Sequence, residues 1–138
     1  MITTRGRYAL QALIDLAEHN DGEYIPLKEI AVRQNISLKY LEQIMRLLNN
    51  AGLVKSSSGK GGGYKLNRTP SEYTVGDVLR VTERITSPVA CFENNTGVCD
   101  HPEKCRTHQM WERYWELINN FFNGITVADL TNKSQNMN

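Results

Sequence analysis

The chain has 138 residues, of which 40% are hydrophobic and 22% are charged, and its formal net charge is +1. This composition is typical of one compact soluble domain with room for an appendage. No apolar run approaches the roughly 18 residues of a membrane span, and no signal-peptide core follows the N-terminus, so we expect a cytoplasmic protein without membrane contact. The charge is uneven: residues 1–68 carry ten Lys and Arg against six Asp and Glu, and residues 69–138 carry six against nine. The first half is therefore the better partner for a polyanion.

The first half predicts three helices. Residues 4–19 carry apolar side chains at helical spacing and end at an Asn-Asp-Gly turn. A short helix follows Pro26, and Ser37 is suited to cap a third helix over residues 38–50. Four side chains of that helix are expected to be buried, namely Leu41, Ile44, Leu47 and Leu48. A short helix, a tight turn and a longer helix form a helix-turn-helix, with residues 38–50 as the recognition helix.

Two short extended segments, 53–56 and 64–66, flank a Gly-rich run. This pattern predicts a β-hairpin, the wing of a winged helix. Gly-rich runs also cradle phosphates in nucleotide-binding enzymes. Here the G-x-G-x-x-G spacing is absent and no long helix follows directly, so a nucleotide site is not expected.

The second half predicts a helix over residues 75–83 with Thr74 as its cap, a long helix over residues 108–123, and a last short helix capped by Thr126. The long helix has a broad apolar face made by Met110, Trp111, Tyr114, Trp115, Ile118, Phe121 and Phe122. Such stripes usually pack in the core of their own domain. This one has more apolar surface than a helix needs to bury when it packs on a small winged helix. Aromatic residues are enriched at interfaces. We therefore predict a homodimer interface at Trp111, Tyr114, Trp115, Ile118 and Phe122.

The expected fold class is mainly α with a small β-hairpin: a winged helix-turn-helix plus a long C-terminal dimerisation helix. We expect residues 1–83 to form the DNA-binding domain and 84–107, which contain all three cysteines, to form a cluster-binding loop. Residues 108–131 are expected to form the dimerisation helix with the short terminal helix, and 132–138 a polar tail. Nothing resembles a nucleophile–base pair or a carboxylate dyad in a defined context. We therefore expect no enzyme and no small-molecule substrate.

The expected recognition helix presents polar residues on faces that its apolar set does not use: Lys39, Tyr40, Glu42, Gln43 and Arg46. Gln bonds adenine edges, Glu accepts from cytosine N4, and Arg or Lys contacts guanine or phosphate. An ordinary solvated face has the same pattern. Lys60 at the wing tip favours DNA, because backbone amides there are free to approach phosphates. Arg5 and Arg7 are further phosphate candidates. Ser37, at the start of the recognition helix, is also counted among the predicted DNA-contact residues, and a double-stranded DNA operator is the predicted partner.

All three cysteines fall within an eighteen-residue segment that ends in a histidine: Cys91, Cys99, Cys105 and His108. Three thiolates and an imidazole are a complete ligand set for a soft or borderline metal or an Fe–S cluster. A disulfide with one leftover thiol requires a secreted protein, which the N-terminus does not favour. A Cys₃His zinc site that binds nucleic acid is the alternative from a different class. His101 is the next candidate if His108 is not a ligand.

Residues 4–9, 36–43 and 59–64 resemble the Rrf family of winged-helix transcription regulators. The four Cys and His residues, followed by Trp111, resemble its iron–sulfur cluster regulator branch. The resemblance covers nearly the whole chain. It implies a homodimeric bacterial repressor or activator, with a [2Fe–2S] cluster held by Cys91, Cys99, Cys105 and His108, that controls genes of Fe–S cluster assembly.

Two positions depart from that pattern. Seven residues separate Cys91 from Cys99, a longer gap than in the best-known members, and Ser58 stands where an arginine is expected at the base of the wing. A flexible loop absorbs extra residues at little cost, so ligation is still expected. The wing contact is then left to Ser58 and Lys60. Related regulators that sense nitric oxide or cysteine status are disfavoured by His108 and by the clustered cysteines, respectively.

Overall fold

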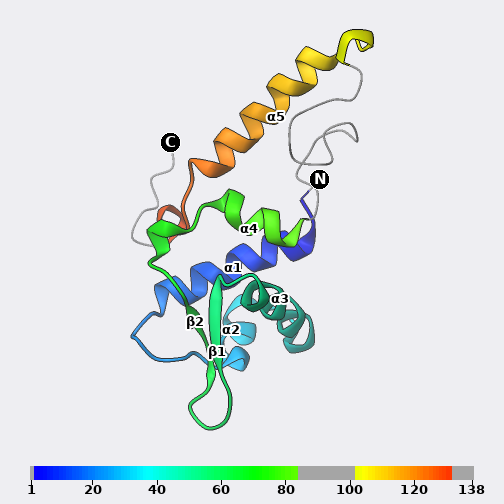
Figure 1. Ribbon diagram of the computed structural model, residues 1–138. Coiled ribbons are helices and arrows are strands. Elements are labelled where there is room, and N and C mark those ends of the chain that lie inside the picture. The colour runs from blue at the N-terminus through cyan, green and yellow to red at the C-terminus, as the bar shows by residue number, and fades with distance from the viewer. Residues whose placement is uncertain (1, 84–101, 132–138) are drawn as a thin grey trace.

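The computed structural model describes residues 2–83 and 102–131 (Figure 1). Three helices open the chain: α1 (Thr4–Glu18), α2 (Leu27–Gln34) and α3 (Leu38–Asn50). Ser37 caps α3, because its side chain accepts a hydrogen bond from the backbone N–H of Tyr40. Asn35 ends α2 in the left-handed region, at φ 54°, which a short polar side chain tolerates and which makes the turn into α3 tight. The predicted helix-turn-helix is thus confirmed.

The predicted wing is confirmed as an antiparallel hairpin of β1 (Val54–Ser57) and β2 (Gly63–Leu66), in which Val54 faces Leu66. A two-residue bridge ties it to the segment before α2, because Ile25 and Tyr64 exchange two backbone hydrogen bonds of 2.9 Å. Gly63 permits this approach: it has φ 148°, and a Cβ there would collide with the backbone carbonyl of Ile25. The hairpin's position on the helical body is therefore set by backbone contacts.

The second half contains a 3₁₀ turn at Pro70–Glu72, α4 (Val75–Thr82), a 3₁₀ turn at Pro102–Lys104, α5 (His108–Asn123) and a 3₁₀ turn at Ala128–Leu130. Thr74 caps α4 as predicted. Thr126 also acts as a cap, and its side chain accepts from the N–H of Asp129. The last element is a single 3₁₀ turn and not the predicted short α-helix. The predictions for residues 84–101 and for the tail 132–138 lie outside the described residues.

The core lies between α1, α2, α3 and the wing, and it includes Tyr73 and Val127 from the second half. In α3 one predicted core residue is wrong: Met45 is fully buried, whereas Leu47 is only partly buried and lines a surface groove. The reason is helical geometry, since position 45 lies between Leu41 and Leu48 on the i, i+4, i+7 row that faces the core. The apolar residue at position 47 lies beside that row.

Tyr73 joins the second half to the wing. Its side chain is fully buried, and its hydroxyl donates to the carbonyl of Leu53 (2.5 Å) and accepts from the backbone N–H groups of Asn67 (2.9 Å) and Arg68 (3.0 Å). Burial raises the pKa of the phenol, while the two N–H donors and the positive charge of Arg68 act against that rise. The phenol therefore remains a neutral donor at ordinary pH.

Helix α5 projects away from the helical body, attached at its C-terminal end to α4 (Figure 1). Arg80 of α4 makes that attachment with one guanidinium nitrogen, which lies 3.0 Å from Asp77 Oδ1 and 3.1 Å from Asn123 Oδ1. Gly76 leaves room for the Asn123 side chain, which a Cβ would strike. No residue of α5 is buried. None of the described helices is long and apolar enough to cross a membrane.

Candidate nucleic-acid interface and metal centre

The exposed face of α3 carries the residues predicted to read DNA. Lys39, Glu42, Gln43 and Arg46 follow one another at i, i+3, i+4 and i+7 and are all exposed. They share that face because the opposite one is buried in the core. Tyr40 is partly buried, and its ring meets the edge of Tyr8 of α1 at 5.8 Å. Lys39, Glu42, Gln43 and Arg46 thus form a polar stripe that faces solvent, on a helix whose opposite face is packed in the core.

A groove of about 460 Å³ lies between the first turn of α1 and α3. It is lined by Thr3, Arg5, Tyr40, Gln43, Ile44, Arg46, Leu47 and Asn50. Two of these residues are arginines from different helices, so the groove is positively charged. Within the described part of the chain the buried Nε of Arg5 has no hydrogen-bond partner. Arginine nitrogens in such a groove suit a phosphate.

The tip of the wing presents a further exposed cation. Lys60 stands between Gly59 (φ 82°) and Gly61 (φ 78°), and Ser58, Gly59 and Lys60 are all exposed. The positive φ values at this tip require glycine. Lys65 of β2 instead lies over the ring of Tyr24, 4.5 Å from its centre. Lys60 is therefore free to extend from the tip of the hairpin, whereas Lys65 is held against Tyr24.

The remaining predicted DNA-contact residues lie near these features. Arg7 is exposed on the first turns of α1. The Ser37 hydroxyl accepts from Tyr40 N (3.2 Å), so its first role is to cap α3. Thr3 and Asn50 line the groove but were not predicted, because a groove between two helices leaves no local pattern in the sequence.

Two of the four predicted metal ligands lie in the described part of the chain, and Cys91 and Cys99 lie outside it. Cys105 is exposed, and its Sγ lies 3.4 Å from the hydroxyl oxygen of Thr107. That hydrogen bond lowers the pKa of the Cys105 thiol and so favours the thiolate, the form that binds metals. His108 opens α5, its backbone N–H donates to the carbonyl of Cys105 (3.3 Å), and its Nε2 lies 3.6 Å from Glu112 Oε2.

These two residues fit a metal or Fe–S centre in their chemistry, since a thiolate-favouring cysteine and an imidazole lie three positions apart on one turn. They lie at the end of α5 that projects farthest from the body (Figure 1). Among residues 2–83 and 102–131 no group of three or more His, Cys, Asp and Glu side chains gathers into a metal site. A complete site therefore requires ligands from outside those ranges.

Helix α5 has an exposed apolar stripe. Its members are Met110 (54% exposed), Tyr114 (45%), Leu117 (57%) and Phe121 (60%). They follow one another at spacings of four, three and four, the seam spacing of a helix that packs against another helix. The other predicted interface residues, Trp111, Trp115, Ile118 and Phe122, are partly buried on the adjacent row. Leu117 was missed, although its spacing was readable from the sequence.

A winged helix-turn-helix with a basic groove beside its recognition helix defines a DNA-binding transcription regulator. The chain belongs to the Rrf2 family, described as "Iron-dependent Transcriptional regulator", whose pattern matches residues 2–133. The predicted fold class and the predicted resemblance are confirmed, and so is the expectation that the protein is a regulator and not an enzyme, because the family and the relatives are transcriptional regulators.

Named relatives are similar over most of the chain. The HTH-type transcriptional regulator IscR of Serratia proteamaculans is 40% identical over 131 residues, which are 95% of this chain and 79% of that protein. Among solved structures, CymR (YrzC), the global cysteine regulator of B. subtilis, has a TM-score of 0.79 at 36% identity and covers 100% of this chain and 98% of its own. The T. potens IscR structure has a TM-score of 0.76 at 35% identity, with 100% and 92% covered.

Proposed function

We propose that this protein is an Fe–S cluster-sensing repressor or activator that binds operator DNA as a homodimer and controls genes of iron–sulfur cluster assembly. The observation that carries the proposal is the pairing of Cys105 and His108 on one turn, in a chain that belongs to an iron-dependent regulator family. In this proposal residues 1–83 bind DNA, residues 84–107 carry ligands and residues 108–131 form the dimer.

The proposed ligands of a [2Fe–2S] cluster are Cys91, Cys99, Cys105 and His108. When bound, such a cluster supplies a redox centre whose presence reports iron–sulfur supply. Thr107 holds Cys105 toward its thiolate form. His108 can serve as a ligand only through the lone pair of a neutral imidazole. Glu112, one turn further along α5, is placed to orient the ring.

Operator binding is proposed to use three elements. The exposed stripe of α3 supplies Glu42 and Gln43 for base edges, with Lys39 and Arg46 for guanine or phosphate. Arg5 in the groove and Lys60 at the wing tip supply phosphate contacts. Phosphate contacts set register and base contacts set sequence preference, so the two groups should be separable by mutation.

The homodimer is proposed to form along the exposed stripe of α5. Three large apolar residues and a tyrosine on one row of a projecting helix are costly to leave in water. A second α5 offers the same seam, because an isologous contact pairs a surface with itself. Two recognition helices would then meet two half-sites of an operator.

The second candidate is a regulator of cysteine status, and the likeness to the global cysteine regulator favours it. The third is a Cys₃His zinc protein that contacts nucleic acid. Anaerobic purification separates the three. Red-brown protein with stoichiometric iron and acid-labile sulfide supports the cluster, and colourless protein with stoichiometric zinc supports the zinc site. Metal-free protein whose operator binding responds to cysteine-related metabolites supports the second candidate.

A further inference from the structure

The N-terminal end of α1 and the C-terminal end of α4 meet at a buried carboxylate that the DNA-binding proposal does not use. Glu83 is only 7% exposed, and it caps the end of α4. Its Oε1 accepts hydrogen bonds from the backbone N–H of Thr3 (3.0 Å) and from the Thr3 hydroxyl (2.6 Å), 80 positions away in sequence. A buried carboxylate is costly unless it is hydrogen-bonded, so the bonds to Thr3 are what make this burial tolerable.

Thr3 is in turn the residue that begins α1. It is the N-cap of the helix, and its hydroxyl oxygen accepts from the backbone N–H of Gly6 (3.3 Å) while its carbonyl accepts from the N–H of Arg7 (3.1 Å). The hydroxyl proton points to Glu83, which leaves the oxygen lone pairs facing the helix. Glu83 therefore orients the capping group in addition to anchoring it.

The close approach of the two helices depends on Gly6. A Cβ at this position would collide with Glu83 Oε1 and would lie 3.2 Å from both Leu79 Cδ2 and Thr82 Oγ1. The glycine has ordinary helical backbone angles, so it is needed for space and not for a positive φ. A larger residue would displace the Glu83 carboxylate from its place beside Thr3 and crowd Leu79 and Thr82.

We propose that Glu83 is a positioning residue for DNA binding. By fixing Thr3 it holds the first turn of α1, and with it Arg5, against the recognition helix. Thr3 and Arg5 both line the groove that α3 completes with Gln43 and Arg46, so a displaced first turn would open that groove. The inference rests on the proposed role of Arg5 as a phosphate contact.

The direction of the change in DNA affinity distinguishes a positioning role for Glu83 from a general electrostatic effect. A carboxylate near bound DNA repels phosphates, so its removal should by charge alone strengthen binding. A positioning role predicts the opposite for Glu83→Ala. Glu83→Gln keeps an oxygen that can accept from both donors of Thr3 while removing the charge, so it should bind at least as well as wild type.

The test measures fluorescence anisotropy of a labelled duplex that wild-type protein selects from a randomised library, over a series of salt concentrations. We expect Glu83→Ala to weaken binding roughly five- to tenfold and to lower the salt slope by about one phosphate contact, because the displaced Arg5 no longer reaches its phosphate. Thr3→Ala should do the same, whereas Glu83→Gln and Thr3→Ser should preserve both quantities. Glu72→Ala is the matched control, because Glu72 also accepts a bond from a cap residue N–H (Thr69, 3.2 Å) in another element.

A double-mutant cycle separates positioning from simple loss of fold. If Glu83 acts through Arg5, Glu83→Ala combined with Arg5→Ala binds no more weakly than Arg5→Ala alone. Additive losses with an unchanged salt slope overturn the inference, and so does Glu83→Ala binding as tightly as wild type. If wild-type protein selects no duplex at all, the proposed operator binding fails and this inference with it.

Discussion

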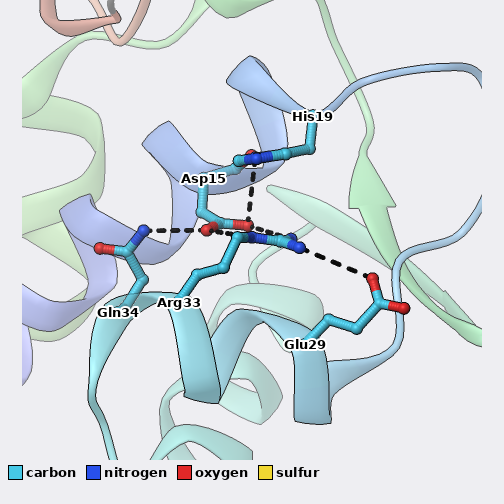
Figure 2. A network of polar contacts seen from close by, with 5 residues as sticks. All are labelled: Asp15, His19, Glu29, Arg33 and Gln34. Atoms are coloured by element: carbon cyan, nitrogen blue, oxygen red, sulfur yellow. Dashed lines mark hydrogen bonds and ion pairs between the residues drawn. The ribbon is translucent and has the colours of Figure 1, made fainter.

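Asp15 of α1 binds Arg33 of α2 through both carboxylate oxygens, with Arg33 Nη2 2.8 Å from Oδ1 and Nε 3.0 Å from Oδ2 (Figure 2). The Asp15 side chain is fully buried, and Gln34 donates a further bond to it at 2.8 Å. The hydrogen bond to Asp15 raises the pKa of Arg33, partly offset by desolvation of the guanidinium, so Arg33 stays protonated. This network holds α2 against α1 and thereby fixes where the turn from α2 into α3 begins.

Asp15→Asn should destabilise the protein by about 1.5–3 kcal/mol, because it removes the charge from a fully buried carboxylate that accepts three hydrogen bonds, whereas the Arg33 side chain is 31% exposed and keeps part of its hydration. Urea unfolding followed by circular dichroism measures the change. Glu29→Gln is the matched control: Glu29 lies 3.6 Å from the same Arg33 but its side chain is 58% exposed, so the loss should be at most about 1 kcal/mol. Equal losses in the free energy of unfolding for the two variants would show that the buried contact stabilises the protein no more than the exposed one.

Substitution of any proposed ligand by alanine should abolish or strongly weaken cluster binding while the fold survives. The reason is that Cys105 is exposed and His108 lies on a helix without buried residues, so neither adds to the core. Iron and sulfide analysis with visible spectroscopy measures the cluster, and thermal unfolding of the metal-free proteins measures the fold. A His108→Ala protein with an unchanged spectrum would remove His108 from the ligand set and leave His101 as the next candidate.

Alanine at Leu117 or Phe121 should weaken self-association by about 2 kcal/mol or more each if these residues are central to the interface. Trp111→Ala and Trp115→Ala, on the adjacent partly buried row, should weaken it as well. Analytical ultracentrifugation gives the dissociation constants, with Glu116→Ala, an exposed residue off the stripe, as the control. Wild-type protein that is monomeric at micromolar concentration would end the dimer proposal.

Glu42→Ala should change sequence preference more than affinity. A carboxylate facing the groove is favourable only where it accepts from cytosine N4, so its loss should weaken cytosine-bearing sites by roughly 1–3 kcal/mol and improve binding to others. Lys60→Ala should weaken all sites about equally and lower the salt slope by about one unit. Competition binding on a randomised duplex library compares the two. An unchanged preferred sequence in Glu42→Ala would assign the readout to Tyr40, Gln43 and Arg46.

The sequence by itself determined helices α1 to α5, the wing and the caps, because these depend on local periodicity and on residues such as Ser37 and Thr74 that act within one turn. It also determined the family, through motifs spread along the chain. The polar face of α3 followed from the same periodicity, since the residues left outside an apolar row must face solvent.

Only the tertiary structure decided which groups from distant segments meet. The burial of Asp15 depends on Arg33, and that of Glu83 depends on Thr3, 80 positions away. Neither pairing leaves a periodic signal, because hydrogen bonds between helices are fixed by how the helices cross and not by spacing along either one.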